Sequence, residues 1–126
     1  MDFNNKRILV VDDEPGILAV LRDIYMTGLG VEVTIASNGL EAFQHLEKDE
    51  FDLLCTDLKM PVMDGGALVK AVRESHGPNK DIPILVVTGY AEDISKIVEG
   101  REKILILDKP IDEKRLINSA KLFLKT

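Results

Sequence analysis

Short apolar segments of this sequence end repeatedly in a side chain that could take part in phosphoryl chemistry. These side chains are Asp12, Asp13, Asp57, Thr88 and Lys109. Three carboxylates held close together repel one another unless a cation joins them, and Mg²⁺ is bound in proteins by few carboxylates together with waters and phosphate. A lysine and a hydroxyl on the other side would suit phosphoryl oxygens. The pattern predicts nucleophilic attack by a carboxylate on phosphorus, with the metal ion and the lysine neutralising the charge that develops.

Each residue taken singly has an ordinary structural interpretation. Asp12 and Asp13 could start a helix, where acidic groups favour the helix dipole. Asp57 could be a helix cap or a turn residue, and Thr88 could be a turn residue. Lys109, which precedes Pro110, could be an exposed loop lysine. The case for chemistry therefore depends on whether the fold brings the five side chains together.

Five apolar stretches read as strands, over residues 6–11, 31–35, 51–55, 82–87 and 104–107. The first and the fourth carry continuous apolar runs, which are typical of parallel strands buried on both faces. The third is a short apolar run that we expect to be buried, and the fifth is the apolar run ILIL. The second alternates Val31, Val33 and Ile35 with polar residues, so we expect it near a sheet edge. The carboxyl ends of parallel strands meet at one rim of the sheet, where open α/β sheets bind their ligands.

Helical patterns lie between the strands. One begins at Pro15 and should end at Gly28 and Gly30. A second follows Asn38, which with Glu41 resembles a capping box. A third should be capped by Asp64, a fourth is expected over residues 91–101, and a fifth after Asp112. The prediction is one α/β domain over residues 1–126. Its fold is flavodoxin-like and doubly wound, with a five-stranded parallel sheet of order 2-1-3-4-5 and five helices in three layers.

Bulk composition narrows the class of protein. The chain has 126 residues, 45% apolar and 30% charged, as in a soluble globular domain. Its net charge of −6 argues against nucleic acid or an anionic membrane as a direct partner. No apolar run reaches the roughly 20 residues that span a bilayer. The single cysteine, Cys55, suits a reducing compartment, so we expect a cytoplasmic protein that is monomeric or weakly associating.

The same residues resemble a known family. Asp12-Asp13, the run DLKMPVMDG from Asp57 to Gly65, Thr88 and Lys109-Pro110 are similar to the receiver domains of bacterial two-component response regulators, of the chemotaxis-regulator-like kind. The resemblance covers essentially the whole chain. It implies a signalling switch, not an enzyme acting on a separate substrate, that promotes its own phosphorylation and dephosphorylation with Mg²⁺.

The resemblance also implies residue roles and partners. Asp57 would accept the phosphoryl group from a sensor histidine kinase or histidine phosphotransfer protein, and a downstream effector protein or domain would read the change. Asp13, Asp57 and the backbone carbonyl of Lys59 would bind Mg²⁺ directly, and Asp12 largely through water. Thr88 and Lys109 would contact the phosphoryl oxygens. The Lys109-Pro110 peptide would be cis, and phosphorylation could promote a weak dimer.

Some positions depart from the family pattern. Many receivers carry an aromatic residue three positions before the lysine, where this sequence has Ile106. A β-branched side chain is restricted at χ1, so the readout is expected to use backbone shifts of the loop after Thr88 and of the fourth helix. Tyr90, two residues after Thr88, could shield the phosphoryl group from water or simply pack on that loop.

Three other classes of protein are less consistent with the sequence. A receiver-like module that works without phosphorylation would be favoured by missing acidic or lysine residues, and none is missing. A phosphatase of the haloacid dehalogenase type would carry Asp-x-Asp, whereas Lys59 is the residue two after Asp57. A flavin or nucleotide carrier would have a glycine-rich loop after the first strand, where the sequence has Asp-Asp-Glu-Pro.

Overall fold

The sheet in the computed structural model, which describes residues 3–89 and 102–125, is parallel and five-stranded. Its strands run in the order β2-β1-β3-β4-β5, as predicted. The bounds are β1 Arg7–Val11, β2 Glu32–Ala36, β3 Leu53–Thr56, β4 Ile84–Thr88 and β5 Ile104–Asp108. From β1 the chain builds the sheet outward in two directions, to β2 on one side and to β3, β4 and β5 on the other. The ends of the neighbouring strands β1 and β3 therefore form the switch point at which such sheets bind ligands.

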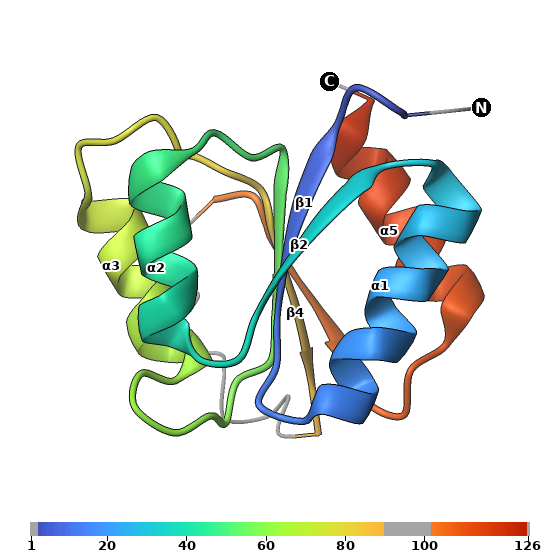
Figure 1. Ribbon diagram of the computed structural model, residues 1–126, viewed down its shortest axis with the longest axis horizontal. Helices are drawn as coiled ribbons and strands as arrows, with labels where there is room; N and C mark the ends of the chain where they lie inside the picture. The colour runs from blue at the N-terminus through green and yellow to red at the C-terminus, as the bar shows by residue number, and fades with distance from the viewer. Residues whose placement is uncertain (1–2, 90–101, 126) are drawn as a thin grey trace.

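Helices cover both faces of the sheet and give three layers (Figure 1). Helix α1 (Pro15–Leu29) and helix α5 (Glu113–Leu124) lie on one face. Helix α2 (Gly39–Lys48) and helix α3 (Gly65–Glu74) lie on the other. The helix expected over residues 91–101 falls outside the described residues. Within the part of the chain that the structure describes, no helix is long and apolar enough to cross a membrane.

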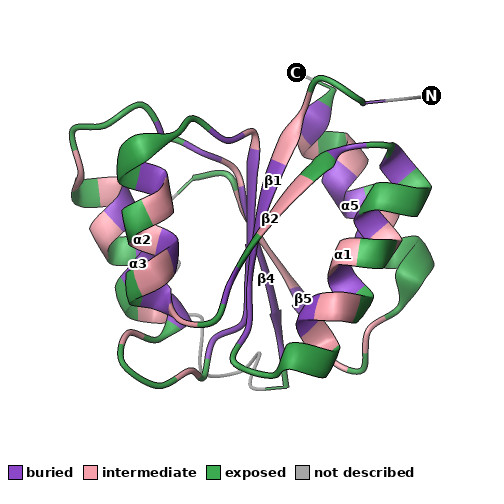
Figure 2. Cartoon of the chain, viewed as in Figure 1, coloured by how far each residue is buried: buried purple, intermediate pink, exposed green. Residues whose placement is uncertain are grey.

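The core has two apolar clusters, one on each side of the sheet. Strands β3 and β4 are buried along their whole length, and β1 is buried after its first residue (Figure 2). This burial explains their continuous apolar sequence. Strand β2 lies at an edge, as its alternating sequence predicted, and Ile35 at its far end remains 39% exposed.

Helix starts follow the predicted caps. The side chains of Asn38, Asp64 and Asp112 each accept a hydrogen bond from a backbone N–H of the first turn of α2, α3 and α5. The capping box at Asn38 differs in one respect, because the Glu41 carboxylate accepts its bonds from the backbone and hydroxyl of Ser37, at 3.4 and 2.8 Å. These caps satisfy first-turn donors that have no partner within the helix.

The end of α1 corrects one prediction. Gly28 does not stop the helix, which continues to Leu29 and ends at Gly30 in the left-handed conformation, with φ of 70°. Gly28 is instead a point of close packing, since a Cβ there would lie 2.6 Å from the Ile117 side chain of α5. The glycine lets α1 and α5 approach each other, which sequence periodicity cannot reveal.

Candidate functional site: an aspartate cluster at the sheet rim

Three aspartates meet where β1 and β3 end. Asp12 and Asp13 follow β1, Asp57 follows β3, and Val11 pairs with Thr56 in the register of the two strands. One carboxylate oxygen from each aspartate lies within 4.8 Å of the other two. Asp12 and Asp57 are buried, at 1% and 7% exposed, whereas Asp13 is exposed. The cluster therefore opens to solvent on the Asp13 side.

Lys109 supplies the positive charge of this cluster. Its ammonium Nζ donates to Asp12 Oδ2 at 3.3 Å and to Asp57 Oδ2 at 3.2 Å, and its side chain is 23% exposed. The Lys109 backbone N–H donates to the Thr88 carbonyl at 2.9 Å, which fixes the end of β5 beside the end of β4. The Lys109-Pro110 peptide is cis, as the family resemblance implied.

Backbone donors orient the two buried carboxylates. Asp57 Oδ1 accepts from the Leu58 N–H at 2.7 Å, and Asp12 Oδ1 accepts from the Glu14 N–H at 3.0 Å. The Asp57 N–H donates in turn to the Val11 carbonyl at 3.0 Å, which ties the aspartate to the end of β1. Both oxygens of Asp57 are thus held by named donors, so the carboxylate has a fixed orientation.

Burial and charge shift the protonation equilibria at the rim. Burial raises the pKa of Asp12, and the nearby Asp57 charge adds to the rise, while the Glu14 N–H and Lys109 oppose it. Burial alone would lower the pKa of Lys109, but the Asp12 and Asp57 carboxylates outweigh it, so the Lys109 pKa is raised. The ammonium is therefore held in its charged form.

The donor set fits a hard divalent cation. Carboxylate oxygens are the ligands that Mg²⁺ prefers, and the exposed Asp13 leaves room for water or phosphate oxygens on one side. One lysine partly neutralises the two buried carboxylates and leaves the third without that contact. Excess negative charge of this kind is relieved by a bound cation.

The remaining predicted residues take different positions. Thr88 ends β4 and is fully buried beside Lys109 at the same rim. Lys59 is exposed on the loop that leaves β3. Ile106 is half-buried on β5 and packs against the apolar core cluster on the α2–α3 side of the sheet. Tyr90 lies outside the described residues.

Sequence reasoning missed the role of Gly65, the first residue of α3. A Cβ at this position would lie 2.1 Å from the Asp57 carbonyl oxygen and 2.9 Å from Leu58 Cα. The Gly65 N–H also donates to the Leu58 carbonyl at 2.8 Å. Only a glycine lets α3 start this close behind Asp57. The Asp-Gly pair at 64–65 signals a helix start, but not this contact.

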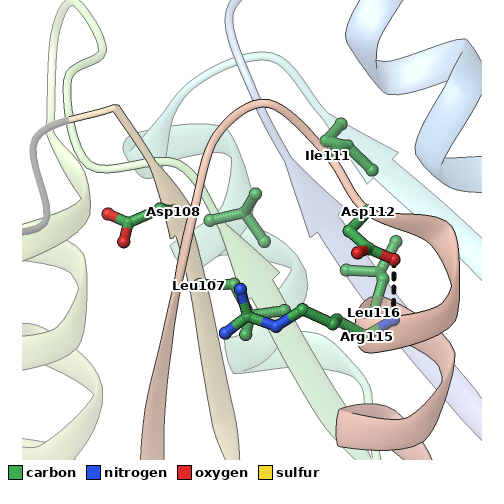
Figure 3. Close-up of a pocket in the computed structure, with 7 residues that line it drawn as sticks. Leu107, Asp108, Ile111, Asp112, Arg115 and Leu116 are labelled. Carbon is green, nitrogen blue, oxygen red and sulfur yellow. Dashed lines mark hydrogen bonds between the residues drawn. The ribbon is translucent and has the colours of Figure 1, made fainter.

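A small hollow lies between the end of β5 and the start of α5 (Figure 3). Leu107 and Leu116 are among its apolar lining residues, and Asp108 and Arg115 are among its polar ones. Its volume is only about 10 Å³, which is room for one water molecule. The aspartate cluster, rather than this hollow, is therefore the candidate site for ligand chemistry.

Comparison with known proteins agrees with this fold. The family described as the response regulator receiver domain matches residues 8–121. Sporulation initiation phosphotransferase F of Bacillus subtilis is 30% identical over 122 residues, which cover 95% of this chain and 94% of that protein. The chain belongs to the response regulator receiver domain family.

Other relatives are longer proteins. A response regulator receiver protein of Anaeromyxobacter is 35% identical over 114 residues, and the transcriptional regulatory protein ZraR of Klebsiella oxytoca is 33% identical over 111. The chain spans 46% and 24% of their lengths. Its fold therefore occurs both nearly alone, as in phosphotransferase F, and as one part of larger proteins.

Solved structures show the same architecture. A CheY-like receiver domain protein from Methanospirillum hungatei superposes with a TM-score of 0.85 at 30% identity, covering 95% of this chain and 94% of that one. The receiver domain of a Pseudomonas aeruginosa sensor histidine kinase has a TM-score of 0.84 at 23% identity, with 96% and 98% covered. That structure holds a magnesium ion coordinated in its active site cleft.

Proposed function

We propose that this chain is the phosphoacceptor switch of a two-component phosphorelay, with Asp57 as the residue that is phosphorylated. The observation that carries the proposal is the Lys109 ammonium, which bridges Asp12 and Asp57 at 3.3 and 3.2 Å inside a cluster of three carboxylates. A buried nucleophilic carboxylate beside a fixed cation is the arrangement that transfer to an aspartate requires.

In the proposed reaction, an Asp57 carboxylate oxygen attacks the phosphorus of a phosphohistidine. The P–O bond forms as the P–N bond breaks, and the imidazole leaves with the electron pair. The Leu58 N–H holds the carboxylate in position, and Lys109 stabilises the negative charge on the phosphoryl oxygens. Thr88, buried at the same rim, is the proposed hydroxyl partner of one phosphoryl oxygen.

The residues that would hold Mg²⁺ are Asp13, Asp57 and the backbone carbonyl of Lys59, with Asp12 contributing largely through water. A bound Mg²⁺ would neutralise charge on the phosphoryl oxygens and on the carboxylates around them. The donor is proposed to be a sensor histidine kinase or histidine phosphotransfer protein. A cytoplasmic effector protein or domain would read the phosphorylated state, and a weak phosphorylation-linked dimer is a further expected consequence.

The test is the intact mass of the protein after incubation with Mg²⁺ and acetyl phosphate. We expect one phosphoryl adduct on the wild type and on Asp64→Asn, and none on Asp57→Asn or with EDTA in place of Mg²⁺. Asp64→Asn is a matched control because asparagine caps a helix as well as aspartate does. A folded wild type that stays unmodified, or an Asp57→Asn variant that is modified at the full rate, would refute the proposal.

Metal binding has its own readout, which does not depend on phosphorylation. Mg²⁺ should raise the melting temperature of the wild type, because a ligand that binds only the folded state stabilises it. The rise should be smaller in Asp13→Asn, since this substitution removes one proposed ligand from the exposed side of the cluster. An equal rise in both proteins, or none at millimolar Mg²⁺, would contradict the metal assignment.

A further inference from the structure

A second, larger hollow lies at the opposite end of the domain from the aspartate cluster. Helices α2 and α3 begin near the cluster and end at the far side of the sheet, where the loop after α3 crosses beside the end of α2 (Figure 1). The hollow lies between these two helix ends and that loop, and its volume is about 180 Å³. None of the residues proposed for phosphoryl transfer lines it.

The floor of this α2–α3 hollow is apolar. Phe43 and Leu46 come from α2, and Val72 comes from α3. Leu46 and Val72 are buried, and Phe43 is half-buried. An apolar cavity of about 150 Å³ is known to hold benzene. The hollow therefore has room for one aromatic ring with a short side arm.

Two helix ends and one carboxylate lie at the rim of the α2–α3 hollow. Helices α2 and α3 both end beside it, at Lys48 and Glu74, and the carboxyl end of a helix carries a partial negative charge. The Glu47 side chain adds a carboxylate to the lining, and His76 is the other titratable residue there. The basic residues in the last turns are His45, Lys48 and Arg73, and none of them lines the hollow. The Arg73 guanidinium donates to the Lys80 and Glu102 carbonyls.

Asn79 makes one wall of the hollow rigid. It is only 3% exposed, and its side chain accepts from the Phe51 N–H at 2.9 Å. Its amide group donates to the carbonyls of Leu46 and Asp49, both at 2.7 Å. These bonds join the loop after α3 to the end of α2 and to the start of β3. The hollow is thus preformed, as most small-molecule sites are.

We propose that the α2–α3 hollow binds a small organic ammonium ion with an apolar body, of the arylalkylamine class. The ring would lie on Phe43, Leu46 and Val72, and the ammonium group would face Glu47 and the two helix ends. The charge at the rim favours a cation over a neutral or anionic molecule of the same shape. This site is separate from the aspartate cluster and does not depend on phosphorylation.

The test uses 2-phenylethylammonium as the probe and 2-phenylethanol as its neutral counterpart. Each is titrated into ¹⁵N-labelled protein up to about 10 mM, which covers the weak affinity expected of a ligand this small. We expect saturable shifts of lining amides such as those of Leu46 and Gly77, with the amine binding more tightly than the alcohol. Saturation without shifts in these amides, or equal affinity for the two probes, would overturn the proposal.

Three variants test whether the amine binds in the α2–α3 hollow and whether Glu47 contributes to its affinity. Gly77→Phe should weaken binding, because it adds a large side chain to a residue that lines the hollow, at a position where a Cβ would meet no atom within 4 Å. Glu47→Gln should weaken amine binding about two- to fivefold, the range for one exposed charge pair. Glu50→Gln, an equal change of charge outside the lining, should leave affinity unchanged. Undiminished binding by a folded Gly77→Phe variant would also overturn the assignment.

Discussion

Replacing Gly65 by alanine tests whether the close packing of the start of α3 against Asp57 matters for stability and for the proposed reaction. The new Cβ would lie 2.1 Å from the Asp57 carbonyl oxygen, and both that oxygen and the neighbouring Leu58 Cα are backbone atoms. To restore an ordinary contact, the two segments must separate by about 1 Å. The substitution therefore has to displace the backbone of Asp57 or the first turn of α3.

The cost of this displacement can be bounded. Overpacking of a well-filled site costs about 1–3 kcal/mol, and we expect Gly65→Ala to lower the free energy of unfolding by that amount. Gly16→Ala is the matched control, because Gly16 also lies in the first turn of a helix and its Cβ would meet nothing within 4 Å. That variant should be neutral or more stable by at most about 1 kcal/mol, as alanine favours the helix.

Urea unfolding measures the stability effect, and the initial rate of phosphorylation by acetyl phosphate measures the effect on the site. A misplacement of about 1 Å can lower a reaction rate on the order of 100-fold, and we expect a loss of that order in Gly65→Ala. Gly16→Ala should react at the wild-type rate. If Gly65→Ala were as stable and as reactive as Gly16→Ala, the close approach of α3 to Asp57 would not be what the site needs.

Two further predictions concern buried polar groups. Asn79→Ala should lower the free energy of unfolding by about 2–4 kcal/mol, because it leaves one N–H and two carbonyls without their hydrogen-bond partner. The control is Asn118→Ala, at an exposed position of α5. Equal urea midpoints for the two variants would contradict the predicted role of Asn79. Because the pKa of Asp12 is raised, its ionisation disfavours folding above that pKa, and this penalty is absent at low pH. In EDTA, Asp12→Asn should therefore gain stability over the wild type as the pH rises above about 4, the ordinary pKa of an aspartate. A gain that shrinks as the pH rises would refute the assignment.

Much of the fold could be predicted because buried segments carry apolar residues in patterns that can be recognised in the local sequence. Continuous apolar runs identified β1, β3 and β4 as buried strands, and alternation placed β2 at an edge. Strand β5 lies at the other edge and is only half-buried over residues 104–106, which its apolar sequence did not indicate. Since parallel strands end at one rim, Asp12, Asp13 and Asp57 could be brought together from sequence order alone. Side-chain caps were also predictable, because a cap and its helix are adjacent in sequence.

Features that depend on distant contacts could not be predicted. Gly28 looks like a helix stop until α5 is seen packed against it, and Gly65 looks like an ordinary helix start until Asp57 is seen behind it. The hydrogen bonds of Asn79 span about 30 residues of sequence, and nothing in a Gly-Pro-Asn loop indicates them. Such contacts are set by how close two elements approach, which periodicity does not encode.

The position of the phosphoryl group shows most directly whether Asp57 is the residue that is phosphorylated. Protein phosphorylated with acetyl phosphate and Mg²⁺ is reduced with borohydride, which converts an aspartyl phosphate to homoserine, and is then digested and sequenced by mass spectrometry. We expect homoserine at position 57 and unmodified aspartate at positions 12 and 13. Homoserine at either of those positions, with Asp57 intact, would contradict it.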